Sequence, residues 1–162
     1  MPIAPNPCIV GVLSDSHGSL DPRVRCVFEG TVAHIIHAGD VGAPSVLDEL
    51  ETIAPVTAVF GNTDGRSIVD VLEWWATPLV CGRRLLVVHE PRHLRQIVMP
   101  PDTHVVVTGH THRPEIDYLS GVLHVNPGST FQPRGPEGRT VALIDLSHPE
   151  PRARIVSLDS VE

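Results

Sequence analysis

Short apolar runs that end in a polar residue able to bind a metal recur along this sequence and constrain its fold more than any other feature. A buried strand reads as a continuous apolar run, and open α/β sheets bind ligands at the carboxyl ends of their strands. We therefore expect these polar residues to converge on one edge. The runs are residues 9–13 before Asp15 and His17, 35–36 before Asp40, 56–60 before Asn62, 85–88 before His89, and 105–107 before His110 and His112.

The residue types at these positions indicate a metal centre. Two carboxylates, one amide and four imidazoles suit one or two divalent transition ions better than calcium or a structural thiolate zinc. A single histidine is more often a surface or core residue than a ligand. The ordered set at strand ends favours metal binding and, with it, hydrolysis by metal-bound hydroxide.

The spacing of the motifs predicts parallel strands with right-handed crossovers. Successive ligand motifs lie 25, 22, 27 and 21 residues apart, and each interval is long enough for a crossover of about a dozen residues. Helices are expected from Asp21-Pro22 to about Gly30 and from Ala43-Pro44 to Glu51. Residues 8–60 thus read as β-α-β-α-β.

The second half of the chain reads as short strands. Residues 79–85 indicate strand, turn and strand, and further strands are expected at 122–125, 141–146 and 153–158. We predict that this half is antiparallel and pairs with or stacks on the first sheet. Because the chain has 162 residues and no linker, residues 1–162 are expected to form a single domain.

Composition limits the partners and the compartment. A net charge of −7 disfavours a nucleic-acid backbone, although two divalent ions would leave −3 and permit a phosphate substrate. Cys8, Cys26 and Cys81 read as reduced core thiols of a cytoplasmic protein. Neither a signal peptide nor a membrane helix is indicated. Self-association into a homo-oligomer is left open.

The motifs occur in the order of a known family. Asp15-Ser16-His17-Gly18, Gly39-Asp40, Gly61-Asn62-Thr63-Asp64, His89 and Gly109-His110-Thr111-His112 resemble the calcineurin-like metallophosphoesterases, and most closely the small prokaryotic phosphodiesterases of the YfcE type. The resemblance runs from about residue 9 to 158. It implies an α/β fold: a two-sheet β-sandwich flanked by helices, in four α/β/β/α layers.

The resemblance also implies roles for the ligands. Asp15, His17 and His112 would hold one metal, Asn62, His89 and His110 the other, and Asp40 would bridge them. Two ions roughly 3.5–4 Å apart would share a hydroxide that attacks phosphorus in line. Manganese is the metal implied, with iron, zinc, nickel or cobalt as alternatives. The residues assigned to catalysis are Asp40, Asn62 and His89, and those assigned to a small phosphate-ester substrate are Asn62, Thr63 and Arg92.

Two positions depart from the family pattern. Thr63 stands where larger relatives carry a histidine that assists the leaving group, and a hydroxyl of very high pKa is a poor general acid near neutrality. We therefore expect slow turnover of esters with poor leaving groups. Glu90 stands where the family usually has glycine, and we expect its side chain to face solvent. His93 competes with His89 as a ligand, but only His89 directly ends an apolar run.

The remaining histidines and the two tryptophans are expected to have structural or supporting roles. His37 is expected to orient ligands by an outer hydrogen bond. Trp74 and Trp75 read as core or interface residues. His34, His104, His124 and His148 read as structural or exposed, and residues 132–138 as a solvated loop.

Several functions fit the sequence. The favoured one is a metal-dependent phosphodiesterase, and a phosphomonoesterase is an alternative. Another is a non-catalytic scaffold like the retromer subunit that shares this fold, but the presence of His89 disfavours it. A single-zinc hydrolase of amides or esters needs only three ligands, fewer than the sequence offers.

Overall fold

The apolar runs form parallel strands, but they are divided between two sheets. The computed structural model describes residues 7–161. β1 (Ile9–Leu13), β2 (His34–His37) and β3 (Val56–Ala58) are parallel neighbours in one sheet. β6 (Arg83–Val88) and β7 (Thr103–Val107) are parallel neighbours in the other. The ligands that follow these strands therefore come from two stacked sheets rather than from one open sheet.

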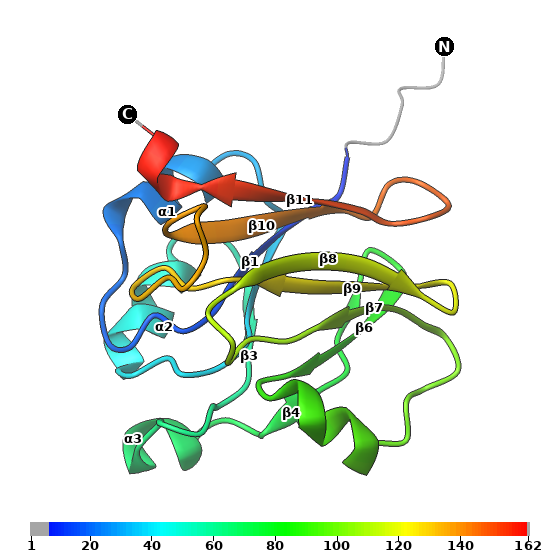
Figure 1. Cartoon of the computed structure of the whole chain (residues 1–162), viewed down its shortest axis with the longest axis horizontal. Coiled ribbons are helices and arrows are strands. Elements are labelled where there is room, and N and C mark those ends of the chain that lie inside the picture. Colours follow the sequence, from blue (N-terminus) through cyan, green and yellow to red (C-terminus); the bar gives the residue numbers. More distant parts are fainter. Residues whose placement is uncertain (1–6, 162) are drawn as a thin grey trace.

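Later strands complete both sheets (Figure 1). The first sheet has the order β11-β10-β1-β2-β3, with β10 (Thr140–Asp145) antiparallel to β1 and β11 (Arg152–Ser157) antiparallel to β10. The second has the order β4-β6-β7-β9-β8, with β5 also paired to β6. Its remaining strands are β4 (Trp75–Ala76), β5 (Leu79–Val80), β8 (Pro114–Leu119) and β9 (Val122–Pro127).

The prediction that the second half of the chain is antiparallel is right in part. β10, β11 and the β8–β9 hairpin are antiparallel, as is the β5–β6 hairpin. The prediction is wrong for β9, which runs parallel to β7. β8 was not expected, because it alternates with exposed charged residues and lacks an apolar run.

The two predicted helices are present. α1 (Pro22–Phe28) begins at Asp21, whose side chain accepts a hydrogen bond from the Arg23 N–H, and proline occupies its first turn. α2 (Pro44–Glu51) likewise begins with proline. The remaining helices are short: α3 (Arg66–Val69) and the 3-10 helices η1 (Pro91–Gln96) and η2 (Leu158–Ser160). In the part of the chain that the structure describes, no helix combines the length and apolar character needed to span a membrane.

The hydrophobic core has two layers. One cluster lies between the sheets and takes valines and isoleucines from both, such as Val12, Ile36, Val87 and Val107. The other packs α1 and α2 on the outer face of the first sheet, where Phe28 is fully buried. Few helices flank the second sheet, where η1 contacts β6. This two-sheet α/β architecture confirms the expected fold class.

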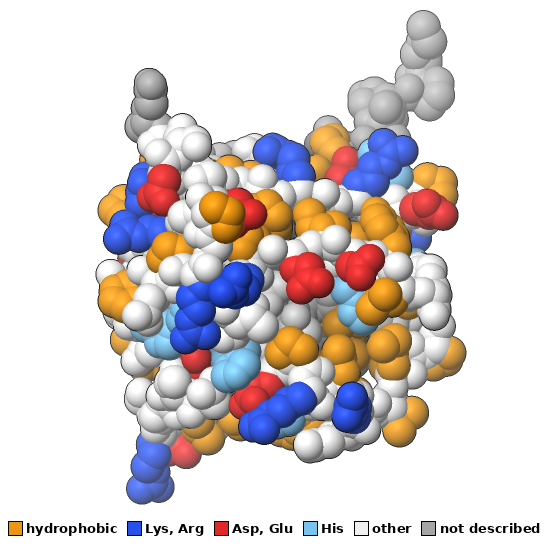
Figure 2. Space-filling model, viewed as in Figure 1, with side chains coloured by type: hydrophobic (Ala, Val, Ile, Leu, Met, Phe, Trp, Pro, Cys, Tyr) orange, Lys and Arg blue, Asp and Glu red, His pale blue; other side chains and the backbone are white. Residues whose placement is uncertain are grey.

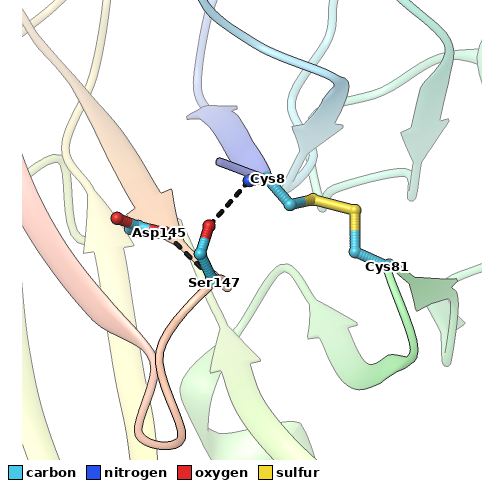
Figure 3. Close-up of a disulfide and its surroundings, with 4 residues drawn as sticks. All are labelled: Cys8, Cys81, Asp145 and Ser147. Atoms are coloured by element: carbon cyan, nitrogen blue, oxygen red, sulfur yellow. Dashed lines mark hydrogen bonds between the residues drawn. A yellow bond between two sulfur atoms is a disulfide. The ribbon is translucent and has the colours of Figure 1, made fainter. Parts of the chain in front are cut away.

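A disulfide links the two sheets, which corrects the expectation of reduced thiols (Figure 3). Cys8 precedes β1, and Cys81 lies in the tight turn between β5 and β6. Their Cα atoms are 6.5 Å apart, within the range that disulfides bridge. Cys26 is a free thiol and is exposed rather than in the core. A sequence separation of 73 gave no local sign of this pairing.

Candidate metal centre

The loops that carry the predicted ligands have an unusual backbone. Non-glycine residues seldom adopt the left-handed region, which costs roughly 1–2 kcal/mol per residue. Such residues cluster at functional sites, where the surrounding structure enforces them. Here the conformation is shared by five of the seven predicted ligands: Asp15 (φ 55°), His17 (48°), Asp40 (53°), His110 (73°) and His112 (58°).

The first group of ligands surrounds Asp15. Its Oδ1 lies 3.2 Å from His112 Nε2 and 4.0 Å from His17 Nε2. The two imidazole nitrogens are 3.4 Å apart. One ligand atom from each of Asp15, His17, Asp40 and His112 lies within 4.8 Å of the others. Four donor atoms so close together form a cradle of the size that a single cation fills.

The second group surrounds the Asn62 side chain. Asn62 Oδ1 lies 3.0 Å from His89 Nε2 and 3.1 Å from His110 Nδ1. His89 follows β6 in the second sheet, whereas Asn62 follows β3 in the first. This group therefore exists only because the two sheets are stacked.

Asp40 stands between the two groups. Its Oδ2 is 3.2 Å from His89 Nε2 and 4.0 Å from His17 Nε2. The other oxygen, Oδ1, accepts a hydrogen bond of 2.9 Å from the Thr63 backbone N–H. The same Asp40 oxygen thus faces a histidine of each group, and it approaches His89 more closely than Asp15 Oδ1 does, at 3.2 Å against 3.8 Å.

Backbone carbonyls fix the protonation of two histidines. His89 Nδ1 lies 2.7 Å from Ala38 O, and His112 Nδ1 lies 2.7 Å from Gln132 O. A carbonyl only accepts hydrogen bonds, so each Nδ1 carries the proton and donates it. With a divalent ion bound, the Nε2 lone pair of each ring would point to it, as in metal-binding histidines, whereas a protonated ring donates from Nε2 to the neighbouring carboxylate.

The electrostatics favour ionised carboxylates. Burial raises the pKa of Asp40, but hydrogen bonds from His89 and the Thr63 N–H outweigh it and hold the pKa well below its usual range. Burial lowers the pKa of His89, but its hydrogen bond to Asp40 and the nearby carboxylate charges raise it overall. The Asp15 carboxylate, with its Oδ1 3.2 Å from Nε2, raises the pKa of His112. The imidazoles thus sit where positive charge is attracted, and a cation would compete with protons for the same nitrogens.

One buried oxygen tests whether a metal fits. Asp15 Oδ2 accepts hydrogen bonds from Ser14 Oγ (2.6 Å) and the His110 N–H (3.0 Å). Asp15 Oδ1 is buried and has no hydrogen-bond partner among the described residues. Buried carboxylate oxygens are normally paired, and this one faces the imidazole nitrogens of His17, His89 and His112. The donor set fits a divalent cation.

Two glycines leave space for the carboxylates. A Cβ on Gly61 would collide with Asp40 Oδ1, and a Cβ on Gly109 would collide with Ser14 Oγ and lie 2.9 Å from Asp15 Oδ2. Neither glycine has a positive φ, so close approach rather than backbone freedom requires them here.

Of the supporting residues, His37 lies where expected. It is fully buried, its Nε2 hydrogen-bonds with Ser16 Oγ (2.8 Å), and its Nδ1 accepts from the Gly39 N–H (3.2 Å). Burial lowers its pKa to about 4, so it is neutral at neutral pH. It orients the loops beside Asp15 and Asp40 rather than a ligand side chain itself.

The prediction for Glu90 is wrong. Its side chain is buried, with 6% of the residue exposed, and its Oε2 accepts a hydrogen bond of 2.7 Å from Arg92 Nε. Arg92 remains largely exposed beside the second group of ligands, where Asn62, Glu90, Pro91, Arg92 and His110 line a pocket of about 390 Å³. Glu90 directly precedes η1, and that helix contacts β6, so the segment folds back on the sheet and the carboxylate is buried.

Three other residues that the sequence singled out lie around the site but have different surroundings. His93 packs its ring against Trp74 and is not among the clustered ligand atoms. Thr63 contributes its backbone N–H to Asp40. Trp74 lies beside the site, in a second pocket that includes Asn62.

The sequence did not reveal several residues that hold the ligands. Ser14 binds Asp15, and Ser129 Oγ donates to the Asp15 carbonyl at 2.8 Å. Asp64 accepts hydrogen bonds from the N–H groups of Val41, Gly42 and Gly61. In the sequence, Asp64 stood out only as part of the motif that contains Asn62. The loop at Gln132, whose carbonyl binds His112, was expected to be a solvated connection.

Two clustered ligand groups joined by one carboxylate define a candidate dinuclear centre on a two-sheet α/β fold. The calcineurin-like phosphoesterase superfamily domain matches residues 9–148, and the chain belongs to that family. The YfcE-type resemblance is confirmed by the solved phosphoesterase YfcE from E. coli, which is 25% identical, with a TM-score of 0.67 over 93% of this chain and 99% of that chain.

Relatives in other organisms agree with this assignment. A probable metallophosphoesterase from Methanothermobacter thermautotrophicus is 34% identical over 78% of this chain and 79% of its own length. A phosphodiesterase from Methanocaldococcus jannaschii is 26% identical over 74% and 82%. Vacuolar protein sorting 29 from Cryptosporidium parvum has a TM-score of 0.71 at 18% identity, covering 93% and 97% of the two chains. That likeness concerns the fold alone.

Proposed function

We propose that this protein is a dinuclear metal-dependent phosphodiesterase. Asp40 would bridge two divalent ions, held by the two residue groups described above. The observation that carries the proposal is the buried, unpaired Asp15 Oδ1 within reach of three imidazoles. The ligand set proposed is Asp15, His17 and His112 for one ion and Asn62, His89 and His110 for the other.

The chain's own residues would prepare the site for a phosphate ester. Bound divalent ions supply a hydroxide nucleophile near neutral pH and positive charge for the phosphate oxygens. The Thr63 N–H keeps the Asp40 carboxylate ionised and oriented. Arg92 uses its Nε to bind Glu90, which leaves its other N–H donors for a phosphate oxygen in the pocket beside Asn62. Thr63 has no group able to protonate a leaving alkoxide.

Metal identity and partner belong to the proposal as well, whereas the expected cytoplasmic location does not. Manganese is the ion implied by the resemblance, and the mixed nitrogen and oxygen donors also suit iron, zinc, nickel or cobalt. Basic, acidic and hydrophobic side chains intersperse on the face in Figure 2 rather than forming one basic surface, which supports a small phosphate ester over a nucleic acid. A cytoplasmic location is opposed by the Cys8–Cys81 bond, because disulfides persist chiefly in oxidising compartments.

The test is a hydrolysis screen with defined metal content. Chelator-stripped protein would be reloaded with Mn²⁺, and its metals per chain counted by elemental analysis. We expect two ions per chain and faster hydrolysis of bis(p-nitrophenyl) phosphate than of p-nitrophenyl phosphate. A preference for the monoester would favour a phosphomonoesterase. Two bound ions without turnover of any ester would favour a scaffold.

A second comparison tests the role of Thr63. Because no side chain at this position protonates the leaving group, nitrophenyl diesters should react faster than alkyl diesters. Equal rates on both would contradict this view.

A further inference from the structure

A second pocket borders the candidate metal centre on another side of Asn62. It has a volume of about 260 Å³ and shares Asn62 and Glu90 with the pocket that contains Arg92. A group attached to a phosphate beside Asn62 would therefore reach it directly. The pocket is lined by Phe60, Asn62, Trp74, Glu90, His93 and Gln96.

The backbone ties Trp74 to the loop that carries Asn62. The Phe60 N–H donates to the Glu73 carbonyl at 3.0 Å, and Val59 forms a β-bridge with Glu73. The His93 ring meets the Trp74 ring edge-on, with centroids 5.9 Å apart at 87°. Trp74 is thus fixed both to the ligand loop and to η1, so its ring is positioned before any substrate arrives.

Glu90 gives the pocket a polar edge. Its Oε2 is occupied by Arg92, whereas its Oε1 has no hydrogen bond to any residue that the structure describes. A buried carboxylate with a spare oxygen accepts N–H donors strongly.

We propose that this pocket binds an aromatic group of the ester substrate, with Trp74 as the stacking surface and Glu90 as the acceptor for an N–H on the ring edge. Guanine has such an edge. The volume is below the 300–1,000 Å³ typical of sites for drug-sized ligands, so it suits one ring system. The inference rests on the proposed function, which places the phosphate beside Asn62.

Two substrates with the same leaving group test the pocket. Guanosine 5′-(p-nitrophenyl) phosphate carries a base, and methyl p-nitrophenyl phosphate does not. We expect the ratio of their kcat/KM values to fall about 10- to 100-fold in Trp74→Leu, the range expected from lost base stacking. Trp74→Phe should restore the ratio to within about threefold, since it retains a ring.

An aromatic residue away from the pocket provides a control, because the ring of the adjacent Trp75 packs 5.9 Å from that of Trp74. Tyr118 is half-exposed in β8 and does not line the pocket, so Tyr118→Leu should leave the ratio unchanged. Glu90→Gln should lower the ratio about 10-fold. Any effect of freeing Arg92 is common to both substrates and cancels. A ratio unchanged in both Trp74→Leu and Glu90→Gln, or equally lowered in Tyr118→Leu, would overturn the proposal.

Binding separates failure of this inference from failure of the proposed function. The unaltered protein should bind guanosine 5′-monophosphate about 10-fold more tightly than ribose 5-phosphate in calorimetry, and Trp74→Leu should lose that preference. If no ester is hydrolysed but the preference holds, the phosphodiesterase proposal fails and the pocket stands. Equal affinity of the unaltered protein for both phosphates would refute the pocket.

Discussion

The two halves of the candidate centre differ in charge and in burial. The half around Asp15 has its own carboxylate, and both Asp15 and His112 are buried. The half around Asn62 has a neutral amide in the corresponding role, and Asn62 is exposed. Both share Asp40. Since charge attraction is stronger away from solvent, the first half should hold its ion tightly and the second should exchange its ion more readily.

This difference predicts separate roles for the two ions. The ion beside Asp15 would be a permanent part of the structure, because it would satisfy a buried oxygen that has no partner within residues 7–161. The ion beside Asn62 would face the pocket with Arg92 and meet the substrate. Occupancy of the second half would then limit activity at low metal concentration.

The largest expected effect comes from Asp40, which both halves share. Asp40→Ala should lower kcat/KM at least about 1,000-fold, or about 4 kcal/mol in the transition state. It should also reduce the metal content below two ions per chain. Elemental analysis and kinetics on nitrophenyl diesters measure both, and circular dichroism checks folding. Full activity in this variant would refute the two-metal mechanism.

Exchanging carboxylate and amide tests the asymmetry itself. Asp15→Asn should weaken the tight Mn²⁺ site at least about 100-fold, because it removes the charge from that half. Asn62→Asp should strengthen the weak site about 10-fold by adding a charge there. Calorimetric titration of stripped protein with Mn²⁺ resolves the two sites. If Asp15→Asn lowered Mn²⁺ affinity equally at both sites, the proposed difference between the two halves would be wrong.

A smaller effect is expected from Ser14. Its hydroxyl donates to Asp15 Oδ2 and directs the other oxygen toward the imidazoles. Ser14→Ala should weaken only the tight site, by about 10-fold, as removal of outer hydrogen bonds does elsewhere. Ser67→Ala, on exposed α3, is the matched control and should change neither site. A change confined to the weak site would contradict the assignment of Ser14 to the first half.

Loss of the disulfide should lower the stability of the fold without favouring either half of the metal centre. Cys8→Ser removes a bond that closes a loop with a separation of 73 residues, which corresponds to about 4 kcal/mol of unfolding free energy in the chain-entropy account. Urea denaturation measures this loss, and Cys26→Ser, at an exposed free thiol, should show none. Affinity for both ions should change less than about twofold. A selective loss at one site would link the bond to the centre.

Local patterns in the sequence predicted much of the fold and site. Apolar runs predicted β1, β2, β3, β6 and β7, and Asp-Pro and Ala-Pro predicted the starts of α1 and α2, because these signals act within a few residues. The seven polar residues at strand ends do converge.

What the sequence missed depends on contacts between distant segments. The Cys8–Cys81 bond joins residues on different sheets. Glu90 is buried beside η1, which contacts β6, whereas a glutamate in the sequence taken alone suggested an exposed charge. The parallel pairing of β9 with β7 depends on β8, an intervening strand without an apolar run.

The disulfide also divides the ligands topologically. It closes residues 8–81 into a covalent ring that contains Asp15, Asp40 and Asn62, while His89 and the Gly109–His112 segment lie on the open tail beyond it. A single proteolytic nick in the exposed segment at residues 65–67 would leave both fragments joined. Once a thiol reductant is added, only noncovalent contacts would hold the two fragments and the metal ligands together, namely the β1–β10 pairing and the packing between the sheets.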